Sequence, residues 1–118
     1  MAISNENIDI KLEKKQDVLV IRLLGRLDAI TAGEAEKRIL ITIDNGEKNL
    51  LLDFQHVEYI SSAGMRVLLS IAKRLRGLSG KLVLCSINTR VMDILKMSGF
   101  DHVIDLQQDE HEALTKFR

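Results

Sequence analysis

The chain has 118 residues, the length of one ordinary domain, and its 17 basic and 17 acidic side chains cancel to a formal net charge of zero. This balance provides no overall attraction to nucleic acid or to an anionic membrane, and no apolar run approaches the roughly 20 residues that a membrane-spanning helix needs. The three Phe and one Tyr are too few to form a base-stacking platform, so the composition argues against nucleic-acid and membrane partners.

The expected location is the cytoplasm. Residues 1–7 lack the basic and apolar regions of a signal peptide, and they are expected to form a flexible N-terminus. The single cysteine, Cys85, has no partner for an internal disulfide and lies in the apolar run 82–85. It is therefore predicted to be a buried thiol in a protein of a reducing compartment.

The first half of the chain predicts a hairpin, a helix and a buried strand. In residues 8–12, isoleucine and leucine alternate with charged residues, and the apolar run 18–24 follows after a short turn. The two segments are expected to pair as an antiparallel hairpin. Thr31 and Glu34 have the spacing of a capping box at the start of a helix. The apolar run 49–54 predicts an interior strand.

The second half of the chain predicts three helices and two strands. The longest helix is expected from about Ser62 to Leu78. Strands are expected over 81–86 and 102–106, with a helix between them and a last helix over 109–117. The helix after Ser62 is expected to bury an apolar stripe, whose members are Met65, Leu68, Leu69, Ala72 and Leu75.

These elements together predict a single α/β domain. Strands that alternate with helices after an opening hairpin indicate a sandwich with a mixed sheet of about five strands and about four helices. Right-handed crossovers between parallel strands would put Asp28 and Ser61–Ser62 beyond the carboxyl ends of their strands. Open α/β sheets place their functional groups at that edge, so the two segments are expected to share one surface.

Several kinds of catalytic or cofactor site are missing from the sequence. It contains no Gly-rich phosphate loop, and His56, His102 and His111 lack the spacing of metal ligands. Ser62 lacks the first glycine of a hydrolase elbow, and no acid is in view to orient His56 as its base. Asp53 ends a strand as in a phosphoacceptor receiver domain, but the acidic pair that such a domain needs is absent. We therefore expect no enzyme activity, no cofactor and no metal.

The start of the helix after residue 61 has two local features that allow more than one explanation. Ser61 and Ser62 are ordinary helix-capping residues, and on local sequence alone capping is a sufficient role for both. Arg66 lies in the first turn, where the helix dipole disfavours a cation, so its presence asks for another reason. The cations Lys73, Arg74 and Arg76 lie nearer the other end, where they complement the dipole as a solvated face.

Three segments in order resemble the STAS domain of bacterial anti-sigma factor antagonists. They are Gly25-x-Leu27-Asp28, Leu52-Asp53-Phe54 and the run from Ile60 to Leu68, which reads Ile-Ser-Ser-Ala-Gly-Met-Arg-Val-Leu. The resemblance covers nearly the whole chain, including the acidic segment of the last helix. It implies one STAS domain over residues 1–118.

The resemblance also implies a function and a partner surface. In the family, a serine kinase that is itself the anti-sigma factor phosphorylates the serine two positions before the motif glycine, which is Ser62 here. The unphosphorylated form binds this kinase and frees its sigma factor, and a metal-dependent serine phosphatase resets the cycle. The expected partner-binding residues are Asp28, Ser61, Ser62, Ala63, Gly64, Met65 and Arg66.

The sequence departs from the commonest family pattern at two positions. Ser61 replaces the acidic residue that often precedes the phosphoserine, and Gln55 replaces the serine that often follows the aspartate of the strand. Ser61 therefore offers a second candidate phosphoacceptor. Two alternatives stay open: a partner-switching or scaffold module with an output in secretion or stress signalling, and a small-ligand sensor in which Ser62 is only a cap. Hydrolysis through Ser62 ranks third.

Overall fold

A computed structural model describes residues 7–118. Residues 1–6, which make up most of the predicted flexible N-terminus, lie outside the described residues. The elements follow one another as β1 (Asp9–Lys15), β2 (Val18–Leu27), α1 (Ala32–Asp44), β3 (Asn49–Ile60), α2 (Ser62–Gly77), β4 (Lys81–Cys85), α3 (Thr89–Met97), a 3-10 turn (Phe100–His102), β5 (Asp105–Gln107) and α4 (Glu110–Thr115).

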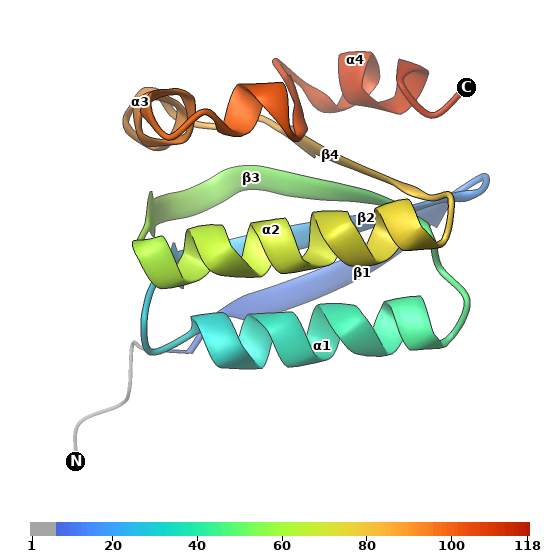
Figure 1. Ribbon diagram of the computed structural model, residues 1–118, viewed down its shortest axis with the longest axis horizontal. Helices are drawn as coiled ribbons and strands as arrows, with labels where there is room; N and C mark the ends of the chain where they lie inside the picture. Colours follow the sequence, from blue (N-terminus) through green and yellow to red (C-terminus); the bar gives the residue numbers. More distant parts are fainter. Residues whose placement is uncertain (1–6) are drawn as a thin grey trace.

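The five strands form one mixed sheet in the order β1-β2-β3-β4-β5. β1 and β2 pair antiparallel as the opening hairpin, and each of the other neighbouring pairs is parallel. The predicted single α/β domain, with about five strands and about four helices, is therefore confirmed (Figure 1). Among residues 7–118, none of the helices combines the length and the apolar character needed to span a bilayer.

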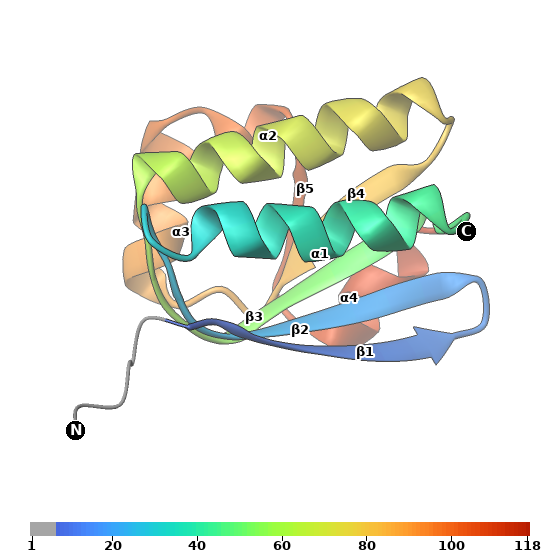
Figure 2. The ribbon, with the colours of Figure 1, turned by 90° about the horizontal axis from the view of Figure 1, so that it is seen from below.

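Helices cover both faces of the sheet. α1 and α2 lie side by side on one face, and α4 lies on the other (Figures 1 and 2). The large core on the first face is built from alternate residues of the central strands, such as Ile21, Leu52 and Leu84, with α3 contributing Val91 and Leu95. The second core, beneath α4, contains Val18, Val20, Leu51, Val83, Cys85 and Ala113. Cys85 is fully buried, as predicted.

α2 is the longest helix, and its bounds agree with the prediction. Three members of the predicted stripe are buried, while Met65 and Leu69 are only partly buried against the core. Val67 and Ile71 are also buried. The buried face is wider than the predicted stripe because α2 packs against the sheet and against α1 at once.

Two strand predictions are wrong in extent. β3 does not stop at residue 54 but continues to Ile60, because its second half pairs in parallel with the end of β2. The predicted strand over 102–106 is mostly a turn: Phe100–His102 is 3-10 helix, and Phe100 and Ile104 enter the core. β5 begins only at Asp105.

Candidate functional site

The carboxyl ends of β2 and β3 bring the predicted site segments together. Leu27 at the end of β2 pairs with Ile60 at the end of β3, and the Ser61 amide donates a hydrogen bond of 3.0 Å to the Leu27 carbonyl. The loops into α1 and α2 therefore lie next to each other at one end of the molecule (Figures 1 and 2). The expectation that Asp28 and Ser61–Ser62 follow neighbouring strand ends agrees with this pairing.

The Asp28 carboxylate is engaged within its own turn. Its Oδ1 accepts hydrogen bonds from the amides of Ile30 (2.9 Å) and Thr31 (3.2 Å), and its Oδ2 accepts one from Arg26 Nε (3.3 Å). Burial would raise the pKa of the Asp28 carboxyl, but these hydrogen bonds outweigh it and lower the pKa below its usual value. Asp28 is thus a fixed negative charge, and no hydrogen bond joins it to Ser62 among the described residues.

The predicted capping box of Thr31 and Glu34 is wrong. Thr31 makes no side-chain cap, because its hydroxyl donates to the Arg26 carbonyl (2.6 Å) and accepts from the Asp28 amide (3.0 Å). The free amides before α1 are instead satisfied by Asp28. These hydrogen bonds stabilise the β2–α1 turn, which lies beside the start of α2.

The two serines of the motif have different environments. Ser61 is the N-cap of α2: it is partly buried, and its Oγ accepts a hydrogen bond of 3.3 Å from the Gly64 amide. Ser62 is the first helical residue and is exposed. Its hydroxyl makes no side-chain hydrogen bond to the described part of the chain. Of the two serines, Ser61 is therefore the one that caps α2. Ser62 is exposed, and its hydroxyl takes no part in the cap.

Gly64 fits α2 tightly against the end of β2. A Cβ built on Gly64 would lie 2.6 Å from the Leu27 carbonyl oxygen and 2.9 Å from Cγ1 of Ile60. Real Cβ atoms do not approach a backbone oxygen this closely. The motif glycine is therefore required by packing, and this contact sets the position of the two serines that precede it.

The remaining predicted site residues fall into two groups. Ala63 and Met65 pack partly against the core next to the serines. Arg66 is exposed and, within residues 7–118, takes part in no ion pair. The motif therefore presents Ser62 and Arg66 to solvent, while the residues between them anchor the helix.

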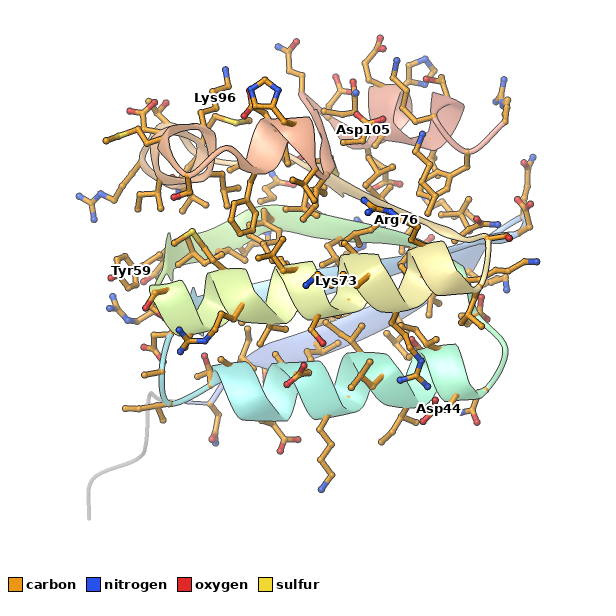
Figure 3. All side chains as sticks on the ribbon, in the orientation of Figure 1. Asp44, Tyr59, Lys73, Arg76, Lys96 and Asp105 are labelled. Atoms are coloured by element: carbon orange, nitrogen blue, oxygen red, sulfur yellow. The ribbon has the colours of Figure 1, made fainter. Side chains whose placement is uncertain are left out.

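Three further residues at this end were missed by the sequence analysis. Arg26 lies over the ring of Tyr59, with 4.8 Å between its Cζ and the ring centroid, and Figure 3 shows Tyr59 near the start of α2. Ile30, in the turn after Asp28, is 63% exposed. The position of Ile30 between Asp28 and Thr31, in a segment expected to be a turn, is the only signal of it in the sequence.

The chemistry of this site can be described from its side chains. No group of three His, Cys, Asp or Glu side chains that could hold a metal is present in residues 7–118. The hydrogen bonds within residues 7–118 include none between His56 and Ser62. The site presents the exposed Ser62 at the N-terminus of α2, with the exposed Arg66 one turn further on and the Asp28 turn at the neighbouring strand end.

Comparison with known proteins identifies the family. Residues 9–113 match the STAS domain. The chain belongs to the STAS domain family. A Bordetella bronchiseptica protein, BtrV, named as a candidate anti-sigma factor antagonist, is 33% identical over 107 residues, covering 91% of this chain and 92% of its own length. The anti-sigma F factor antagonist of Paenibacillus polymyxa is 27% identical over 111 residues, covering 93% and 95%.

Solved structures share the STAS fold with this chain. A candidate anti-sigma factor antagonist from Thermotoga maritima superposes with a TM-score of 0.89 at 22% identity, covering 92% of this chain and 94% of that one. The phosphorylated form of the Bacillus cell fate determinant SpoIIAA superposes with a TM-score of 0.71, also at 22% identity, covering 93% and 100%. At this identity the likeness extends to the fold, which agrees with the predicted STAS sandwich.

Proposed function

We propose that this STAS domain is a phosphorylation-controlled binding switch. Its unphosphorylated form binds an anti-sigma factor that is also a serine kinase, and this binding releases the sigma factor. Phosphorylation of Ser62 by the same kinase abolishes the complex, and a serine phosphatase restores it. The names of the relatives, which are anti-sigma factor antagonists, support the choice of partner.

The observation that carries the proposal is the difference between the two serines. A kinase needs an accessible hydroxyl, and Ser62 is exposed without a hydrogen bond to the rest of the described chain. Phosphorylation of Ser61 would instead remove the cap of α2, because its Oγ holds the Gly64 amide. Losing such a cap costs about 0.5–2 kcal/mol. The geometry therefore favours Ser62 as the phosphoacceptor over Ser61.

The folded domain is suited to tolerate a phosphate on Ser62. A phosphoserine carries about −1.5 to −2 charges at neutral pH. On the first residue of α2 these charges would meet the positive end of the helix dipole and the free amides of the first turn. Arg66, one turn further on, adds a cation that is free to pair with the phosphate. This gives Arg66 a role near the start of the helix, where the dipole disfavours a cation.

The partner surface, by contrast, would be changed strongly by the phosphate. Asp28 already places one fixed negative charge beside the Ser62 segment, with its pKa held low by the hydrogen bonds of its turn. A phosphate would add about −1.5 to −2 charges at this end of the molecule, where Arg26 already pairs with Asp28. A partner shaped for a neutral hydroxyl would then have to bury an unpaired charge, which is costly in a desolvated interface.

The assignment of the phosphoacceptor can be tested with single variants. The kinase is first isolated from the native cytoplasm as a protein that the unphosphorylated domain retains, and it is incubated with ATP and each variant. Mass spectrometry should find phosphate on the wild type and on Ser61→Ala, and none on Ser62→Ala. Ser62→Ala should still bind the kinase. Phosphate found on Ser61, or no kinase activity toward the domain at all, would contradict the proposal.

A further inference from the structure

α2 carries a net positive charge, whereas the chain as a whole is neutral. Its sequence from residue 62 to residue 77 contains four cations, Arg66, Lys73, Arg74 and Arg76, and no acidic side chain. The chain as a whole has a formal net charge of zero. α2 therefore has a net positive charge of its own, and it begins at the proposed phosphoacceptor.

A groove runs along α2 where it faces α1. The groove has a volume of about 600 Å³, and its lining combines apolar and cationic side chains from the two helices: Leu40, Arg66, Leu69, Ser70, Lys73 and Arg74. α1 and α2 lie side by side on the same face of the sheet (Figures 1 and 3). Leu40 and Leu69 are partly exposed, so the floor of the groove is apolar.

The cations of the groove differ in whether they are already paired. Arg74 Nη2 lies 2.6 Å from Oδ1 of Asp44 in α1, which neutralises that end of the groove. Arg66 and Lys73 form no ion pair with any residue in the described range 7–118. They are seven residues apart, which places them two turns, or about 10.5 Å, apart along one side of the helix. Two free cations thus flank a partly apolar floor.

We propose that this groove binds an acidic amphipathic helix of the partner protein. Two carboxylates seven residues apart on such a helix have the same spacing as Arg66 and Lys73. Apolar side chains between these carboxylates would pack on Leu40 and Leu69. A helix is the occupant that a groove between two neighbouring helices accepts through ridges-into-grooves packing. The inference rests on the proposed function in identifying the partner as the anti-sigma factor kinase.

The groove also explains how one phosphate can act on a large interface. Arg66 lines the groove and lies one turn from Ser62, so a phosphate on Ser62 would compete with the partner's carboxylate for the same guanidinium. The phosphate would also repel the acidic helix directly. In the unphosphorylated state, the cationic groove faces an acidic helix of opposite charge. In the phosphorylated state, the phosphate places a negative charge against that acidic helix.

The first test uses a designed peptide, so that it does not depend on phosphorylation. The probe is a synthetic helical peptide with two glutamates seven residues apart and leucines between them, titrated into the ¹⁵N-labelled domain. Amide shifts should saturate and gather around Leu40, Leu69 and Lys73. Lys73→Glu should weaken binding by about tenfold or more, and a peptide with the matching glutamate changed to lysine should restore it. Added salt should weaken the wild-type complex.

Arg76→Glu is the matched control. It makes the same charge change on the same helix, but Arg76 points away from α1 and lines a separate pocket with Lys81 and Asp105 (Figure 3). It should bind the peptide as the wild type does. Equal losses for Lys73→Glu and Arg76→Glu, shifts away from the groove, or no saturable shifts would overturn the inference.

The second test separates the groove from the phosphorylation switch by using the kinase itself. If Lys73→Glu binds the kinase at least tenfold more weakly than Arg76→Glu does, the groove is part of the interface. If both bind as tightly as the wild type while phosphorylation of Ser62 still abolishes binding, the groove inference is wrong and the proposed function stands. If phosphorylation of Ser62 has no effect on kinase binding while the peptide still binds the groove, the proposed function is wrong and the groove stands.

Discussion

Gly64→Ala should destabilise the domain although alanine is the better helix former. In an open helix position, replacing glycine by alanine gains about 1 kcal/mol. Here the new Cβ would lie 2.6 Å from the backbone oxygen of Leu27 and 2.9 Å from Ile60, and a backbone atom cannot turn aside as a flexible side chain can. Overpacking of this kind costs about 1–3 kcal/mol. We expect the loss to exceed the gain, leaving a net destabilisation of about 1–2 kcal/mol.

Gly77→Ala is the control for this prediction. Gly77 lies in the last turn of the same helix, and a Cβ built there has nothing within 4 Å. It should raise the free energy of unfolding by up to about 1 kcal/mol. Urea denaturation of both variants and the wild type gives the comparison, with similar slopes expected for all three. A Gly64→Ala domain as stable as the wild type would refute the packing explanation of the motif glycine.

Three further predictions concern the core, the acid stability and the site. Leu68→Ala should lose about 2–5 kcal/mol in urea denaturation, because Leu68 is fully buried; a loss under about 1 kcal/mol would contradict its place in the core. The hydrogen bond from Arg22 lowers the pKa of Glu110 below 4.5; burial opposes this shift and the hydrogen bond from Lys15 adds to it. The ionised Glu110 therefore stabilises the fold fully above that pH, and this stabilisation is lost as the pH falls through the pKa of the folded state. Unfolding measured at neutral and acid pH should therefore depend less on pH in Glu110→Gln than in the wild type, and an unchanged slope would refute this. Asp28→Asn keeps the acceptor for the turn amides but removes the charge, so thermal unfolding should change little while kinase binding changes; a collapse of the fold would show that the charge itself is structural.

The parts of the fold that could be predicted are those whose residue pattern lies within one continuous segment of the chain. The helical spacing of apolar residues in α2 and their alternation in β1 each lie within one stretch of chain. The predicted helix and the predicted hairpin are both confirmed. The second half of β3 could not be found in this way, because Gln55, His56 and Glu58 are exposed there. Its pairing with the end of β2, where bulges shift the register, supplies what the local sequence lacks.

The site shows the same division between local and distant information. The sequence places Ser61 and Ser62 at a helix start, and either hydroxyl could cap the helix. Only the structure shows that Ser61 accepts the hydrogen bond from the Gly64 amide, while the Ser62 hydroxyl is left free within the described residues. The predicted capping box assigned the Thr31 amide to the Glu34 side chain, but Asp28 accepts that hydrogen bond instead. The groove could not be predicted, because it exists only where α1 and α2 lie side by side.

The measurement that tests the central claim most directly compares one sample before and after phosphorylation of Ser62. Its affinity for the kinase and its thermal unfolding midpoint are recorded in both states, with Ser62→Ala treated in parallel. We expect kinase affinity to fall more than a hundredfold, equivalent to about 3 kcal/mol, while the unfolding midpoint stays close to its original value. A phosphorylated domain that binds the kinase as tightly as the unmodified one, or that melts far below it, would contradict the account.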